Sequence, residues 1–310
     1  MDFNYRKQQH HLFLLLFILV SLIQTSCKQK PEDQKKIRFG PVIGIHYTEV
    51  RRRLNTGRSF DNHGYEVSPT WKMFFLPKDS AGVFSPDSNR FLTFPVTIDH
   101  DSLFNVANTW LKAKIITKDS LVFQVLAVEG KMVRFARSTV YMTFYADDYI
   151  KTLKTSLVDM QKTDHADTLF VQKMAAQANK YPDSLFAARV PVVLQSRSPF
   201  VKVEKEKVIA SRENRFDTSE SYLDPVYDIT IHHAYQDFGY SFTVLVDTNG
   251  QMHFRESLVY IFPEFKESTI RVIKGIIDGY LKVYIAAKPG NTLGITHNSL
   301  ISLYVAGRKK

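Results

Sequence analysis

Hydrophobic positions in the first half of the chain follow the alternation of β-strands. Five stretches rich in aromatic and β-branched residues are separated by turn formers such as Pro77-Lys78-Asp79 and Lys118-Asp119-Ser120. They are Trp71 to Leu76, Phe91 to Ile98, Leu111 to Ile116, Leu121 to Val128 and Thr139 to Tyr145. This pattern predicts an antiparallel β-rich domain over residues 39–162. Because Leu121 to Val128 is apolar on both alternating faces, we expect at least one central, buried strand.

Helical spacing appears at both ends of this domain. Tyr47, Val50 and Leu54, followed by Gly57, predict a short opening helix with Arg51 to Arg53 on its solvated face. The spacing of Ile150 to Met160, and then of Leu169 to Asn179, predicts a helical connector. We expect a domain boundary near residue 165, and a second, α+β domain over residues 163–310. The polar stretch Ser211 to Glu220 predicts a loop in that domain.

The C-terminal segment predicts a hairpin, a helix and further strands. Tyr240 to Val246 and Gln251 to Leu258 flank Asp247-Thr248-Asn249-Gly250, in which the Asn-Gly pair is typical of a hairpin turn. A helix is expected to begin at Pro263, to bury Phe265, Ile270, Ile273 and Ile277, and to end at Gly279. Extended runs follow at Tyr280 to Ala287 and Leu300 to Ala306.

The order of these elements, with "FTVLVDTNGQMHFRESLV", "FPEFKESTIRVIKGIIDG" and "SLISLYVA", resembles the TonB C-terminal domain over residues 225–308. The resemblance implies a ββαβ fold whose edge strand pairs with another chain, a recognition mode in which backbone hydrogen bonds supply affinity. We therefore expect a partner-binding edge at Leu300, Ser302, Leu303 and Tyr304. Two departures argue against energy transduction like that of TonB itself. Tyr280-Leu281-Lys282-Val283 replaces the family's aromatic and proline pattern after the helix, and an inner-membrane helix with a Pro-rich spacer is missing.

The N-terminus predicts export and lipid attachment. A short basic stretch precedes an apolar block that starts at Leu12 and is too short for a permanent membrane-spanning helix. Leu22-Ile23-Gln24-Thr25-Ser26-Cys27 resembles a lipoprotein cleavage box of the Bacteroidetes type, although Gln24 stands where Leu is preferred. This resemblance implies a signal peptide over residues 1–26, acylation of Cys27 and a tether over residues 27–38. The alternative is an ordinary signal peptide with an incidental cysteine.

Charge and cysteine content narrow the setting of the protein. The formal net charge of +10 is compatible with a nucleic acid, anionic lipid headgroups or an acidic polysaccharide as partner. The export signal argues strongly against nucleic acid, and a diffuse basic surface with no dedicated partner is the favoured interpretation. Cys27 is the only cysteine, so an internal disulfide is impossible and core packing must supply the stability. Acyl chains on Cys27 would make membrane attachment effectively permanent. We expect a Gram-negative cell envelope location, at the outer rather than the inner membrane.

Candidate catalytic groups are sparse. His232 and His233 are adjacent, so on a strand they face opposite sides; one of them could meet His253 beside Asp247 or Asp237, but zinc needs three or four convergent ligands. His233 and His253 are therefore weak metal candidates, and we predict no metal, cofactor or catalytic residue. Asp99-His100-Asp101 could orient an imidazole for catalysis, but we expect these residues in a turn. Trp71 and Trp110 could line a sugar or peptide groove, but we expect them in the core.

Two functions remain open at this point. The first is a lipid-anchored interaction or assembly module that binds an envelope protein through an exposed sheet edge. The second is an exported enzyme that acts on an envelope polymer. The sequence motifs of common hydrolases and nucleotide-binding proteins are missing, which favours the first function.

Overall fold

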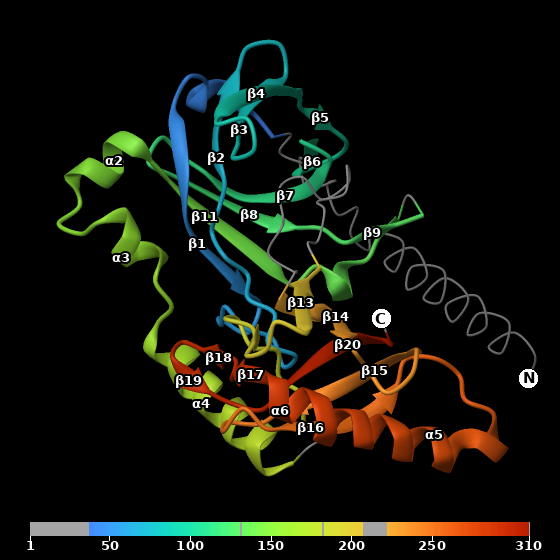
Figure 1. Cartoon of the computed structure of the whole chain (residues 1–310). Coiled ribbons are helices and arrows are strands. Elements are labelled where there is room, and N and C mark those ends of the chain that lie inside the picture. The colour runs from blue at the N-terminus through green and yellow to red at the C-terminus, as the bar shows by residue number, and fades with distance from the viewer. Residues whose placement is uncertain (1–36, 131, 182, 207–221, 310) are drawn as a thin grey trace, which may run out of the picture.

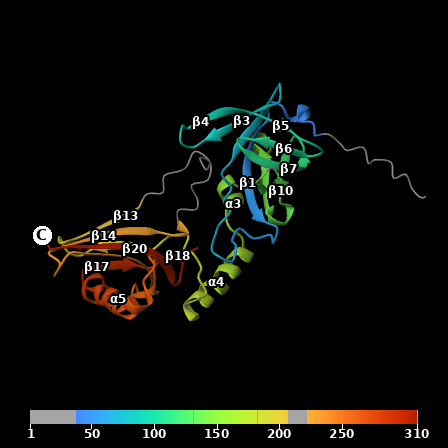
Figure 2. The ribbon, with the colours of Figure 1, turned by 90° about the vertical axis from the view of Figure 1, so that its right-hand side faces the viewer.

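The computed structural model describes residues 37–130, 132–181, 183–206 and 222–309, which form an α+β protein with two large β-sheets and three two-stranded ones (Figure 1). The predicted signal peptide, Cys27 and the polar stretch 211–220 lie outside these residues. Figure 2 shows one sheet above the connector helix and the other beside it.

The first sheet contains nine antiparallel strands in the order β4-β3-β2-β1-β11-β8-β7-β6-β5. Their bounds are β1 His46–Leu54, β2 Lys72–Leu76, β3 Ser80–Ser85, β4 Arg90–Pro95, β5 Thr97–Ile98, β6 Leu103–Val106, β7 Thr109–Ile116, β8 Ser120–Val125 and β11 Val140–Ala146. The antiparallel β domain is thus confirmed, and β8 is a central strand, as its apolar faces predicted.

The sheet curls back on itself and is nearly a barrel. Its two outermost strands, β4 and β5, are separated in sequence by Val96 alone, so one extended segment forms both ends of the sheet. The side chains that fill the interior include Phe75, Phe104, Phe123 and Phe144, all essentially inaccessible to solvent. Short elements lie outside the nine-stranded sheet: the 3-10 helices η1 (Gly40–Val42) and η2 (Phe135–Arg137) and the pair of β9 (Val128–Glu129) and β10 (Met132–Val133).

The predicted helix over Tyr47 to Leu54 is wrong, because these residues form β1. A bulge between Glu49 and Arg51 breaks the alternation expected of a strand, and the apolar spacing then resembles that of a helix. Arg51 is exposed as expected, but the next two arginines are held by carboxylates. Arg52 forms a bidentate pair with the buried Glu49, through nitrogen–oxygen distances of 2.7 Å.

A helical connector follows β11, as predicted, in the form of α2 (Asp147–Thr152), α3 (Leu157–Gln161) and α4 (His165–Lys180). Asp164 and Asp167 form a reciprocal capping box at the start of α4. Asp167 is fully buried; its Oδ1 accepts the backbone N–H of Ser59 at 2.6 Å, and Arg53 lies 3.5 Å from its Oδ2. These bonds fix α4 to the loop between β1 and β2.

The second sheet has five strands in the order β13-β14-β20-β15-β16. Their bounds are β13 Val201–Lys205, β14 Val226–His232, β15 Phe238–Val246, β16 Met252–Ser257 and β20 Ser299–Arg308. The pairing of β14 with β20 is parallel and the other pairings are antiparallel. The hairpin β15–β16 turns at Gly250, whose φ of +78° is the conformation that the Asn-Gly signal predicted.

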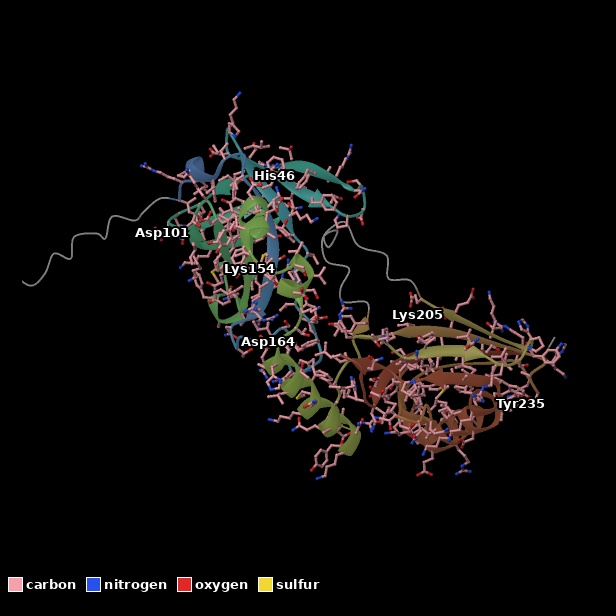
Figure 3. The ribbon with its side chains drawn as sticks, turned by 90° about the vertical axis from the view of Figure 1, so that its left-hand side faces the viewer. His46, Asp101, Lys154, Asp164, Lys205 and Tyr235 are labelled. Atoms are coloured by element: carbon pink, nitrogen blue, oxygen red, sulfur yellow. The ribbon has the colours of Figure 1, made fainter. Side chains whose placement is uncertain are left out.

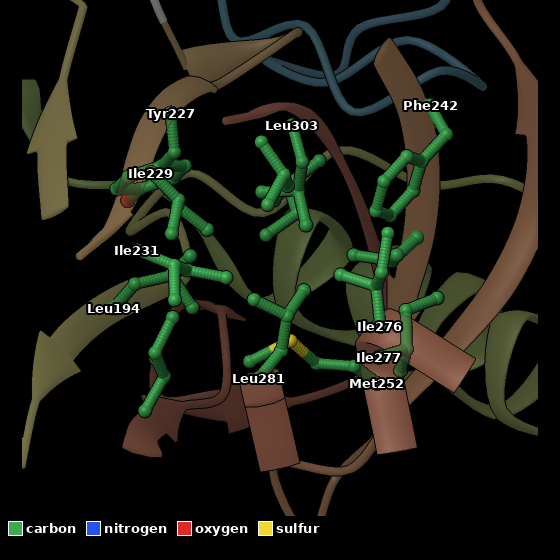
Figure 4. Packing of buried hydrophobic residues seen from close by; sticks show 14 of the residues in the cluster. Leu194, Tyr227, Ile229, Ile231, Phe242, Met252, Ile276, Ile277, Leu281 and Leu303 are labelled. Atoms are coloured by element: carbon green, nitrogen blue, oxygen red, sulfur yellow. The ribbon is translucent and has the colours of Figure 1, made fainter. Parts of the chain in front are cut away.

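One face of this sheet packs against a long helical segment (Figure 4). The segment comprises α5 (Pro263–Ile276), the π-helical turn η4 (Ile277–Leu281) and α6 (Lys282–Tyr284). Helix therefore continues past the predicted end at Gly279, since Ile277 and Leu281 are buried in the core and hold the next turn on the sheet. The small strands β12 (Val193–Ser196) and β17 (Ile285–Lys288) pair beside it, and β18 (Asn291–Thr292) pairs with β19 (Ile295–Thr296).

The barrel contacts the C-terminal half of the molecule, which contains α4 and the second sheet, around Phe60 in the loop between β1 and β2. Phe60 packs with Val171 and Ala178 of α4 and with Phe186. Close by, Arg189 Nε and Glu66 Oε2 are 2.5 Å apart, which joins the second half to the same loop. A buried apolar cluster and an ion pair thus fix the contact between the barrel, α4 and the second sheet.

Candidate partner-binding site

The predicted binding strand does not lie at an edge of its sheet. β20 pairs with β14 on one side and with β15 on the other, so Leu300, Ser302, Leu303 and Tyr304 are in the middle of the sheet. Leu303 is fully buried in the core, and only the Tyr304 side chain is well exposed. The error arose because β14, which precedes the hairpin in sequence, occupies the position beside β20. The edges are β13 and β16.

No strand among the described residues pairs with β16 on the side away from β15, so backbone groups on that side are open to a partner. The N–H of Asp247 donates to Gln251 O and that of Leu258 to Ser241 O, which fixes the residues that face β15. In an antiparallel ladder the backbone N–H and C=O groups of successive residues point alternately toward and away from the neighbouring strand. The bulge near Arg255 adds one residue to this alternation. The backbone N–H and C=O groups that point away from β15 are those of Met252, Phe254 and Ser257.

A groove runs between this edge and the α5–η4 segment. It consists of two cavities, of about 470 and 290 Å³, both of which are lined by Phe254. Lys266 and Ile270 line the larger cavity, and Lys274 and Ile277 the smaller one. We call this feature the β16 groove.

A patch of exposed apolar side chains stands at one end of the groove. It comprises Leu258, Val259, Tyr260, Phe262 and Phe265, which we call the apolar patch. Tyr260, Phe262 and Phe265 are 79%, 60% and 58% exposed. The expected burial of Phe265 is therefore wrong, because the first turns of α5 project past the strands (Figure 1), and only Ile273 and Ile276 of this helix are fully buried. Contiguous exposed apolar surface of this kind marks binding sites.

The charges beside the groove are mainly positive. Lys282 is paired with Asp278 at 2.8 Å, and Arg255 with Asp183 at 2.6 Å. Within the described part of the chain, Lys266 and Lys274 form no salt bridge. The groove therefore offers a ligand two lysines that have no salt-bridge partner among the described residues.

The weak metal candidates are not brought together. β14 and β16 are separated by two strands, so neither His232 nor His233 meets His253. The His233 ring lies against Phe200, whereas His253 Nε2 is 3.0 Å from Asp247 Oδ2. Among the described residues, no three histidine, cysteine, aspartate or glutamate side chains are placed to hold a metal ion.

Hydrogen bonds shift the titration of Asp247. Although partial burial acts in the opposite direction, the bonds from His253 and from the backbone N–H groups of Gln251 and Asn249 hold the pKa of this carboxyl below its ordinary value. The same bonds stabilise the β15–β16 turn. The His253–Asp247 pair is thus explained by the hairpin that carries the edge strand.

The remaining candidates of the sequence analysis lie in the barrel. Asp99 and His100 form an exposed pair, 2.7 Å apart, in the turn between β5 and β6, and Asp101 is on the barrel, away from the second sheet (Figure 3). Trp71 belongs to the barrel core, and Trp110 is half-buried on β7. A further cavity of about 430 Å³ opens at one end of the barrel, beside Arg38 and Lys78.

The β16 groove and the apolar patch were missed by sequence reasoning. The uninterrupted apolar run Leu258 to Phe262 was a signal for the patch, because a chain that leaves a strand for a helix is usually polar. The groove had no such signal, since it depends on the order of strands.

Comparisons with protein-family models and with curated proteins give no match to this chain. In the part that the structure describes, none of the helices is both long and apolar enough to cross a bilayer.

Proposed function

We propose that this chain is a bacterial lipoprotein of the Gram-negative cell envelope, fixed by lipid on Cys27 to a membrane, the outer one in preference, whose C-terminal domain captures a partner protein. The partner's extended segment adds to the second sheet at β16, so that its backbone pairs with the outward N–H and C=O groups of Met252, Phe254 and Ser257. No chemistry is done on the partner.

The observation that carries this proposal is the conjunction of an unpaired edge, a groove and an exposed apolar patch along one strand. Proteins generally protect sheet edges with charges, prolines or covering loops, because bare edges invite pairing. β13 carries a Lys202–Glu204 ion pair, 2.8 Å apart, on its exposed side chains. β16 also carries charged side chains, Arg255 and Glu256, but it leads directly into the apolar patch, and this surface suits a bound segment better than water.

The resemblance to the TonB C-terminal domain belongs to this proposal. Support comes from the order of the hairpin β15–β16, the helix α5 and the strand β20, with the short strands β17, β18 and β19 between α5 and β20. The proposal departs from that expectation in the strand that receives the partner, which is β16 and not β20.

Photo-crosslinking in cells tests the proposal. A photoreactive phenylalanine analogue in place of Tyr260 should give a discrete adduct with an envelope protein. Ser257→Pro should reduce that adduct about tenfold or more, because proline removes an outward N–H without breaking a bond to β15. Ser257→Ala, which keeps the N–H, should leave it unchanged.

The same analogue at Val158 serves as a control, because this side chain is 66% exposed on α3 in the connector, outside the groove. An adduct at Tyr260 that is indifferent to Ser257→Pro, or no adduct beyond that seen from Val158, would contradict strand capture. It would return the exported enzyme acting on an envelope polymer as the leading function.

A further inference from the structure

Three side chains of α5 form a stripe along the β16 groove. Lys266, Ile270 and Lys274 are spaced four residues apart, so they lie on one side of the helix. The first two line the larger cavity and the third lines the smaller one, and both cavities include Phe254 of the edge strand. The stripe therefore faces the position that an added strand would occupy.

From this stripe we infer that the captured segment carries an acidic, an apolar and a second acidic side chain at alternate positions, in the pattern acidic-x-apolar-x-acidic. This inference rests on the proposed function and names the class of its ligand. The apolar side chain contacts Ile270 and Phe254, and the acidic ones pair with Lys266 and Lys274.

The spacing of helix and strand supports this pattern. Eight residues of α-helix rise about 12 Å, which is the separation of the two lysines along the axis. Four residues of extended chain span about 13 Å, and residues two apart share a face. A strand that runs beside α5 thus places side chains i, i+2 and i+4 against Lys266, Ile270 and Lys274, in either direction of the chain.

The other charged side chains of the groove do not pair with Lys266 or Lys274, so both lysines can pair with a ligand. Lys282 and Arg255 are already paired with carboxylates. Glu256 also borders the larger cavity, but it is opposite Thr243, whereas Ser257 is opposite the core residue Phe242. The Glu256 side chain therefore belongs to the other face of the sheet and does not neutralise the lysine stripe.

Binding of two labelled synthetic peptides to the full mature chain tests the inference. One peptide contains Glu-x-Ile-x-Glu and the other Lys-x-Ile-x-Lys, with threonine elsewhere, and fluorescence anisotropy gives each Kd. The wild-type chain should prefer the glutamate peptide about tenfold, because each partly exposed ion pair contributes up to a factor of about five. Added salt should reduce this preference.

A charge-reversal variant sharpens the test. The double substitution Lys266→Glu and Lys274→Glu should weaken binding of the glutamate peptide about tenfold and strengthen that of the lysine peptide by a similar factor. Both lysines are exposed, so the fold should tolerate the change. The matched control is Lys114→Glu with Lys173→Glu, two exposed positions on β7 and α4 that change the net charge equally; it should bind as the wild type does.

The outcomes separate the two proposals. If both peptides bind equally to all three proteins and Ser257→Pro abolishes binding, strand capture stands and the charge pattern is overturned. If the glutamate peptide binds but Ser257→Pro has no effect, capture by backbone pairing is overturned. If neither peptide binds, both proposals fail.

Discussion

The imidazole of His297 and the hydroxyl of Thr292 are hydrogen-bonded, with 3.1 Å between Nε2 and Oγ1, in a fully buried position beside Phe186. The same hydroxyl accepts the backbone N–H of Arg189, and the neighbouring Asn298 N–H donates to Asn179 of α4. His297 therefore lies where the residues that precede β20 contact α4. Burial lowers the pKa of this imidazole, although its bond to Asn298 O acts in the opposite direction.

This arrangement predicts loss of stability in mild acid. Because the folded state favours neutral His297, the unfolded chain binds more protons once the pH falls below the ordinary value of 6.5, and the free energy of unfolding decreases. The His297→Gln variant, which cannot be protonated, should lose this contribution. Urea unfolding between about pH 8 and about pH 5 measures it. His232→Gln, at an exposed position at the end of β14, is the control. An equal pH dependence in wild type and His297→Gln would contradict the prediction.

A glycine at the contact between the two halves gives a second prediction. Gly64 has φ +93°, and a Cβ there would lie 2.5 Å from Ala187 O. Gly57 has φ +81° with open space around it. Gly57→Ala should cost about 1 kcal/mol for the backbone conformation alone. Gly64→Ala should cost about 1 to 3 kcal/mol more, because Ala187 must move. Thermal unfolding of both variants measures the difference. Equal losses of stability would contradict the prediction, because they would show that Ala187 moves aside at little cost.

The buried Glu49 predicts unequal roles for neighbouring arginines. Its carboxylate accepts two bonds from Arg52 and the backbone N–H groups of Thr70 and Trp71. Arg52→Met should destabilise the barrel by about 3 kcal/mol, because a buried carboxylate loses its cation. Arg51→Met, at the exposed neighbour, should change stability by less than about 0.5 kcal/mol. Denaturant unfolding monitored by tryptophan fluorescence compares them; a similar small effect in both would mean that Glu49 does not depend on Arg52.

The central position of β20 predicts what proline does there. Leu303→Pro removes a fully buried side chain and a donor from a strand that is paired on both sides, so it should lower stability by at least about 3 kcal/mol. Ser257→Pro, on the outer side of β16, should lower it by less than about 1 kcal/mol. Circular dichroism melting curves measure both changes. A Leu303→Pro variant as stable as Ser257→Pro would contradict the observed strand order.

Lipid attachment is tested at Cys27 itself. Mass spectrometry of the membrane-extracted chain should show an acylated N-terminus at this residue. Cys27→Ser should accumulate as unprocessed precursor, because the thiolate is the nucleophile that receives the lipid. Wild-type protein that is cut at another residue and carries no lipid would refute the anchor.

The amino-acid sequence by itself determined the elements that depend on neighbouring residues. The Asn249-Gly250 pair specified a tight turn because Gly250 adopts positive φ at little cost, and Pro263 marked the start of α5. Alternating apolar residues located most strands of the barrel, since a period of two suffices to bury one face.

The tertiary structure alone decided which strands lie side by side. The sequence of apolar and polar residues along β20 is the same whether β14 pairs with it or not. The central position of β20 in the sheet could therefore not be predicted from its own residues. The bulge in β1, the curling of the nine-stranded sheet into a near-barrel, and the β16 groove likewise depend on contacts between residues far apart in sequence. Strand order depends on the free energy of such non-local contacts, which no single segment encodes.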